Sequence, residues 1–227
     1  MFNVKSLLWS MALVGCLQFS CTAQEPKTEE LPAPTRSGGK PIMEAFNNRH
    51  TERKFLNDKQ IPKQILSNLL WATWGVNRDD GRHTAPTAKN NQEIEVYVAK
   101  ADGLWRYDPA NNALVLFQAG DARLGRFKEA PVMFYYVAPD NDHWAPMHVG
   151  SLYQNAGLYC ASVGLGNVVL GSVDKEINAK YTFPKGWVAI AAQAFGWPEG
   201  TKRIDPSKMP KNPGRGPAIP SGVDIKK

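Results

Sequence analysis

Two short links between strand-like segments constrain the fold more than any other feature of the sequence. Residues 93–99 (EIEVYVA) alternate in the manner of a strand, and residues 102–103 (DG) then supply a turn. Residues 104–108 (LWRYD) lead to a second turn at residues 109–112, and residues 113–117 form another apolar run. Because links this short join antiparallel neighbours, the sequence predicts a sheet that is largely antiparallel.

The remaining periodic segments do not alternate regularly between helix and strand. Helical spacing and composition predict helices at residues 41–47, 61–75 and 150–166, and apolar runs predict strands at residues 131–137 and 187–196. A doubly wound parallel sheet would require a steady alternation of the two. The sequence therefore predicts an α+β domain in which helices flank a mostly antiparallel central sheet.

Several common site signatures are missing from the sequence. The glycines of residues 164–171 (GLGNVVLG) do not match a dinucleotide-binding fingerprint, and neither a Walker A sequence nor G-x-S-x-G occurs. His143 and His148 lie near Asp140 and Asp142, but a zinc or iron site needs three or four convergent ligands. We therefore expect these histidines to lie in a solvated loop, without a metal ion.

The first 23 residues have the character of a secretory signal peptide. One charge, Lys5, precedes about ten apolar or small residues, a stretch too short to span a bilayer as a helix. The processing site is open between a lipobox at residues 13–16 (LVGC), a poorer one ending at Cys21, and ordinary cleavage near residues 21–23 (CTA). We expect an exported protein that is periplasmic or lipid-anchored in the cell envelope.

The next segment, residues 24–40, is rich in Pro, Glu and Gly and nearly free of apolar side chains. This composition predicts a flexible linker. We therefore expect the folded domain, with a C-terminal tail, to comprise residues 41–227. Only Cys160 of the three cysteines belongs to it, and its apolar surroundings in the sequence favour a buried side chain over a reactive thiol.

The net charge of +6 comes from 27 basic and 21 acidic residues that are spread along the chain. Nucleic-acid binding favours a clustered basic stripe, which the sequence does not contain. The excess is compatible with an anionic small ligand or simply with solubility.

One local cluster of donors stands out at residues 48–55 (NRHTERKF). Arg49, His50, Thr51 and Arg53 combine two guanidinium groups, an imidazole and a hydroxyl. Arginine binds phosphate through two parallel hydrogen bonds, so the cluster suits an anionic ligand. The alternative is a solvated surface turn in which Glu52 and its charged neighbours have no ligand.

A second polar stretch leads directly into the first predicted strand. Pro86, Thr87, Asn90 and Gln92 belong to it, and the two amide side chains carry both donors and acceptors. Such groups can recognise the edge of a heterocycle. Asn and Pro before a strand are equally typical of an ordinary turn.

The order of three motifs in the chain resembles the nitroreductase family of FMN-dependent flavoproteins. In that family the first motif typically reads R-x-S-x-[RK]-x-F, and residues 49–55 match it with threonine in place of serine. The second reads P-S-x-x-N-x-Q, and residues 86–92 match it with Thr87 in place of serine. The third is a helix-ending GLG followed by an apolar strand and a glycine turn, matched at residues 164–174. The likeness extends over about residues 41–200.

The resemblance implies roles at the first motif. Arg49 and Arg53, with Thr51 and His50, are expected to hold the FMN phosphate and ribityl chain. Charge-assisted hydrogen bonds make such a role physically reasonable.

The other two motifs are expected to meet the isoalloxazine ring. Thr87 and Asn90, together with Gln92 in the segment that Pro86 opens, are expected to face the ring, in this family partly across a dimer interface. Backbone groups at Gly171 and Ser172 are expected near N5 and O4.

The chain departs from the family pattern in two places. The third motif commonly has a glutamate just before its glycine, where this chain has Leu170, so we expect the polar surroundings of N5 to differ from those in the family. The basic phosphate ligand that the family usually adds from a C-terminal segment cannot be assigned among Lys208, Lys211 and Arg215.

The resemblance implies a homodimeric FMN-dependent oxidoreductase that passes hydride from flavin N5 to a small acceptor such as a nitroaromatic or a quinone. The electron donor is expected to be NADH or NADPH, although export would separate the protein from the nicotinamide pool of the cytoplasm. The alternative is an exported flavin- or ligand-binding protein of the same fold that catalyses no turnover. No nucleic acid is expected as a partner, and a membrane is expected only through a lipid anchor.

Overall fold

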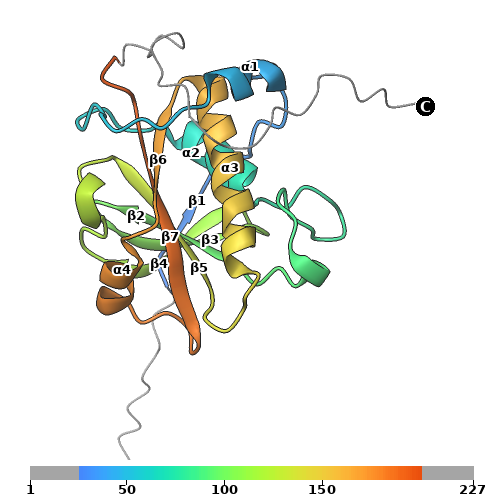
Figure 1. The fold of residues 1–227 in the computed structure, drawn as a ribbon, viewed down its shortest axis with the longest axis vertical. Helices are drawn as coiled ribbons and strands as arrows, with labels where there is room; N and C mark the ends of the chain where they lie inside the picture. Colours follow the sequence, from blue (N-terminus) through green and yellow to red (C-terminus); the bar gives the residue numbers. More distant parts are fainter. Residues whose placement is uncertain (1–25, 201–227) are drawn as a thin grey trace, which may run out of the picture.

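The computed structural model of the chain describes residues 26–200 (Figure 1). The predicted signal peptide and the tail beyond residue 200 lie outside the described residues. Within the described part of the chain, no helix combines the length and the apolar character that crossing a bilayer requires.

The described residues form seven strands, four α-helices and two short 3-10 helices. The strands are β1 (Thr28–Glu30), β2 (Glu95–Lys100), β3 (Gly103–Asp108), β4 (Ala113–Ala119), β5 (Val132–Pro139), β6 (Gly166–Leu170) and β7 (Trp187–Gly196). The α-helices are α1 (Ile42–Asn48), α2 (Lys63–Trp74), α3 (Ala145–Val163) and α4 (Asp174–Lys180). The 3-10 helices are η1 (Ala88–Asn90) and η2 (Gly125–Phe127).

The strands make one sheet in the order β1-β4-β3-β2-β5-β7-β6, and each neighbouring pair is antiparallel. The two predicted hairpins are β2–β3 and β3–β4. The α+β class with a mostly antiparallel sheet is therefore confirmed, and β7 has the predicted bounds. Helix α3 begins at Ala145, earlier than predicted, because Pro146 is compatible with the first turn.

Two cores lie on opposite faces of the sheet, as the alternation of side chains along each strand requires. Val98 and Phe134 belong to the core that also contains Cys160 of α3, whereas Tyr97 and Tyr135 belong to the core that contains Ile177 of α4. Figure 1 shows α3 lying across the sheet and α4 at its lower edge. Cys160 is fully buried as predicted, and burial raises the pKa of its thiol, so the reactive thiolate is disfavoured.

The prediction that residues 24–40 form a flexible linker is wrong for part of that segment. Residues 28–30 form β1, which pairs with β4 at the edge of the sheet. Glu29 forms ion pairs with Lys63 at 3.0 Å and Lys100 at 2.9 Å, and Leu31 is buried in the core. An edge strand pairs through its backbone hydrogen bonds and does not require apolar side chains. The polar side chains of β1 therefore gave no strand pattern in the sequence.

Candidate functional site

The segment that carries the first motif is fixed by its backbone, and its candidate side chains lie outside. The Arg49 N–H donates to Ala45 O at 2.8 Å and ends α1. Further along, the Glu52 N–H donates to Asn167 O at 2.8 Å in β6. Arg49, His50, Thr51 and Arg53 are all exposed. The backbone of this segment is thus bound to the sheet, and the donor side chains point to solvent.

Glu52 is the residue of this segment that the sequence did not reveal. Glu52 is 1% exposed, so the alternative of a solvated turn is wrong for this residue, whereas Arg53 and Lys54 beside it are exposed. One carboxylate oxygen accepts the backbone N–H groups of Arg53 and Lys54, each at 2.8 Å. The other oxygen lies 3.9 Å from His50 Nε2. This buried carboxylate therefore fixes the turn from which Arg53 projects.

The two glycines of the GLG sequence in the third motif, Gly164 and Gly166, have different structural roles. Gly164 has a φ of +77° and ends α3 in the left-handed conformation that glycine adopts without strain. A Cβ on Gly166 would meet Glu52 Cγ at 2.7 Å and Phe55 Cε1 at 3.2 Å. The second glycine therefore allows the first motif to pack directly on β6.

A surface cavity of about 350 Å³ joins the first and third motifs. Its lining consists of Arg53, residues 125–127, residues 168–173 and Glu176. The structure thus brings Arg53 together with Gly171 and Ser172, although the segments lie far apart in the sequence. A Cβ on Gly171 would meet no heavy atom within 4 Å, so the turn has free space beside it.

Arg49 is directed to a different place from Arg53. A Cβ placed on Gly157 in the middle of α3 would meet Arg49 Cγ at 3.8 Å. His50 lines a separate cavity of about 370 Å³ beside residues 164–167 at the end of α3. Its Nδ1–H donates to Asn48 O at 2.7 Å, which sets the orientation of the ring. His50 and Arg53 therefore line two neighbouring cavities, and Arg49 lies beside α3.

The second motif forms a tight loop around η1. The Gln92 N–H donates to Thr87 Oγ1 at 3.0 Å, and the Asn90 N–H donates to Thr87 O at 3.1 Å. Lys89, Asn90 and Gln92 have φ values of 54°, 56° and 54°. Asparagine tolerates this left-handed region, but lysine and glutamine adopt it at a cost. The turn alternative is correct for the local backbone, and Pro86 and Asn90 are exposed at it.

His148 attaches this loop to the start of α3. The Ala88 N–H donates to His148 Nε2 at 2.8 Å, so the neutral ring carries its proton on Nδ1. Nδ1 has no hydrogen-bond partner among the described residues and lies 3.7 Å from an oxygen of Asp142. His148 is buried, which is a correction to the solvated loop that the sequence predicted for it.

We expect His148→Leu to loosen the loop of residues 86–92 because the Ala88 amide loses its acceptor. The free energy of unfolding should fall by about 1 kcal/mol, the usual net value of one hydrogen bond. Hydrogen exchange measured by mass spectrometry should show faster exchange in the peptide that covers this loop. His143→Leu is the control because His143 is exposed, and equal exchange in the two variants would contradict the assignment.

Within one chain, the second motif does not approach the first. His148 binds the loop of the second motif, and Arg49 of the first motif lies beside Gly157. These two positions on α3 are nine residues apart, which corresponds to about 14 Å along the helix. In Figure 1 the segment that follows α1 runs to the left of α3, whereas the segment between α2 and β2 extends to its right. The expected convergence of Thr87, Asn90 and Gln92 with Arg53 is therefore not found in the single chain.

Metal binding receives no support from the side chains of residues 26–200. None of their His, Cys, Asp and Glu side chains form a group of three or more that could hold a metal ion.

Comparisons with known proteins agree with one another. A family model described as the nitroreductase family matches residues 47–197. A protein of Methanocaldococcus jannaschii that is provisionally named a nitroreductase is 28% identical over 142 residues, which cover 50% of this chain and 70% of that protein.

Solved structures show the same architecture. A protein of Ralstonia eutropha, also provisionally named a nitroreductase, superposes with a TM-score of 0.70 at 32% identity and covers 78% of this chain and 95% of its own. A structure from Desulfovibrio desulfuricans, described as a complex with FMN, has a TM-score of 0.52 at 18% identity, covering 79% of this chain and 100% of its own. At that identity the second likeness concerns the fold alone.

Proposed function

The chain belongs to the nitroreductase family of FMN-dependent oxidoreductases, and we propose that it uses FMN to reduce a small acceptor such as a nitroaromatic or a quinone. NADH or NADPH is the proposed electron donor. When bound, FMN supplies the two-electron chemistry, and the protein supplies binding, orientation and electrostatics.

The observation that carries this proposal is the cavity shared by Arg53, Gly171 and Ser172. A flavin ring needs hydrogen-bond donors and a positive charge where reduction places negative charge. Arg53 offers a guanidinium group whose backbone is held by Glu52, and the turn at residues 171–172 offers backbone groups beside free space. These residues fit the ring of FMN.

Arg49, His50 and Thr51 are the proposed partners of the phosphate and ribityl chain. They lie on the same exposed segment as Arg53, but Arg49 lies beside α3 and His50 lines the neighbouring cavity. The two arginines therefore serve different parts of the cofactor in this proposal, which departs from the expectation that both hold the phosphate and ribityl chain. Charge-assisted hydrogen bonds from a guanidinium group are strong enough to account for retention of a phosphate.

A second copy of the chain completes the site in the proposed homodimer. Residues 86–92 of one copy, including Pro86, Thr87, Asn90 and Gln92, meet the flavin ring held by the other copy. Two observations support this arrangement: in one chain the segment that follows α1 and the segment between α2 and β2 lie on opposite sides of α3 in Figure 1, and large apolar side chains are exposed on α1 and at the start of α3. These exposed residues are Ile42, Met43, Phe46, Trp144 and Met147. Light scattering during gel filtration tests the proposal.

Export to the periplasm or the outer face of the envelope, with or without a lipid anchor, remains the proposed localisation, and its support is the leader-like sequence of residues 1–23. The competing function is binding of FMN or another ligand without turnover. A physiological donor other than a nicotinamide would be required if none is supplied outside the cytoplasm.

Spectroscopy of the purified protein distinguishes catalysis from binding. We expect a yellow protein whose flavin absorbance is bleached by NADH or NADPH in the absence of oxygen. A nitroaromatic or a quinone should then restore the colour. Flavin that stays oxidised with both nicotinamides, yet is bleached by dithionite, would support binding with a different donor or without turnover.

A further inference from the structure

The loop between β4 and β5 brings a third segment to the cavity of Arg53. Residues 121–123 and Ala130 form its base, and η2 forms its tip. Phe127 at the tip packs edge-on against Phe55 of the first motif, with ring centroids 6.3 Å apart. The loop is therefore in direct contact with the proposed flavin-binding segment, although none of the three family motifs includes it.

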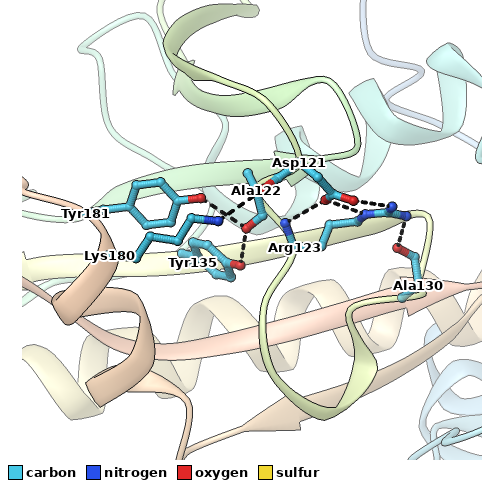
Figure 2. Close-up of polar contacts among 7 residues, drawn as sticks. All are labelled: Asp121, Ala122, Arg123, Ala130, Tyr135, Lys180 and Tyr181. Atoms are coloured by element: carbon cyan, nitrogen blue, oxygen red, sulfur yellow. Dashed lines mark hydrogen bonds and ion pairs between the residues drawn. The ribbon is translucent and has the colours of Figure 1, made fainter.

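Hydrogen bonds that range from buried to exposed hold the base of this loop (Figure 2). The Ala122 carbonyl accepts the hydroxyl groups of Tyr135 at 2.7 Å and Tyr181 at 3.4 Å. Lys180 Nζ donates to Asp121 O at 3.1 Å. The loop is thus attached both to β5 and to the end of α4.

An ion pair closes the base of the loop. Arg123 donates from Nε and Nη2 to the two oxygens of Asp121 at 3.0 and 2.8 Å. Its Nη1 also donates to Ala130 O at 3.2 Å, which joins the two ends of the loop. Two parallel hydrogen bonds between a guanidinium and a carboxylate are strong and directional. Because the loop is held in this way, its tip is already in position, and binding does not lose the conformational entropy that ordering a mobile segment would lose.

Arg126 is the charged residue at that tip. It lines the 350 Å³ cavity with Arg53, and the two also line an adjoining cavity of about 400 Å³. The first cavity contains one acidic side chain, Glu176, whose carboxylate accepts the Gly125 N–H at 3.4 Å. The adjoining cavity contains Glu129 and Glu199 against Arg53, Lys54 and Arg126. Both cavities therefore carry an excess of positive charge.

We propose that Arg126 is a specificity-determining residue that selects an aromatic acceptor bearing a carboxylate. The inference rests on the proposed function, in which Arg53 serves the flavin and leaves Arg126 available to the substrate. The Arg126 guanidinium carbon lies 5.3 Å from the centroid of the Phe127 ring. A planar guanidinium next to an aromatic ring suits an aromatic carboxylate, which can form paired hydrogen bonds and a ring contact at once.

The test compares 4-nitrobenzoate with 4-nitrobenzamide, which differ in charge and little in shape. The native holoprotein should have a higher kcat/KM for the benzoate. Arg126→Ala should lower the benzoate-to-benzamide ratio of kcat/KM about tenfold, mainly through KM, because one charge-assisted contact is lost. Lys128→Ala removes an equal charge from the same loop, and Lys128 is absent from the lining of both cavities, so the ratio should not change.

A binding measurement separates this inference from the proposed function. Calorimetry with benzoate, which accepts no electrons here, should show binding to the oxidised holoprotein that weakens about tenfold in Arg126→Ala and not in Lys128→Ala. If neither these two acceptors nor a quinone is reduced, the proposed function is wrong, and calorimetry still decides the role of Arg126. Equal ratios and equal benzoate affinities in the two variants would overturn the inference. If Arg126→Ala changed only the preference for NADPH over NADH, the anionic group bound by Arg126 would belong to the electron donor. That result would likewise overturn the inference.

Discussion

Replacing Arg49 and Arg53 together by alanine should give a folded protein that has lost its flavin. Each arginine provides charge-assisted hydrogen bonds, with an expected contribution of about 1.5–3 kcal/mol. If both act on one ligand, the dissociation constant for FMN should rise by about 10²–10⁴. Absorbance of the purified protein and fluorescence titration of the flavin-free protein with FMN measure the change.

Circular dichroism should show unchanged secondary structure for this double variant, because both side chains are exposed. The control is Lys27→Ala with Lys185→Ala, which removes the same charge from two exposed positions outside the three motifs and outside the linings of the cavities that contain Arg53 or His50. Flavin occupancy that is equal in the two double variants would remove Arg49 and Arg53 from the cofactor site.

Gly166→Ala should disturb both stability and flavin binding. The added Cβ would meet Glu52 Cγ at 2.7 Å, and Glu52 is buried, so it cannot turn away into solvent. Overfilling a packed site of this kind costs about 1–3 kcal/mol of unfolding free energy. Because the same carboxylate fixes the backbone at Arg53, we also expect weaker FMN binding. Urea unfolding and FMN titration measure the two effects.

Gly171→Ala is the matched control for the unfolding measurement in flavin-free protein. A Cβ at this position meets no heavy atom within 4 Å, and the substitution is chemically identical. Its unfolding free energy should stay within about 0.5 kcal/mol of that of the native chain. Equal stability of Gly166→Ala and Gly171→Ala would mean that Glu52 does not hold the segment as described.

Local patterns in the sequence predicted the central strands of the sheet, but they did not predict the edge strand β1. The turn at residues 102–103 predicted the β2–β3 hairpin, and a run of mostly apolar residues predicted β7. Strand β1 has three polar residues and pairs through its backbone, so no side-chain pattern marked it. Helix α4 has seven residues and a single buried position, Ile177, which is too little for a helical period to be recognised.

The sequence predicted the candidate site correctly where two motifs lie on neighbouring parts of the fold. Arg53 lines the same cavity as Gly171 and Ser172 because the first motif packs on β6, which leads to that turn. The position of residues 86–92 depends on the contact of Ala88 with His148, between segments far apart in the sequence. Glu52 was hidden because a charged residue among charged residues is usually solvated.

The identity of the cofactor tests the central claim most directly. Mass spectrometry of the small molecule released from the purified, full-length protein should give the mass of FMN, and the absorbance should correspond to about one flavin per chain, since the family's chemistry depends on the bound cofactor. Protein that contains no flavin and does not bind added FMN, although it is folded, would contradict the account.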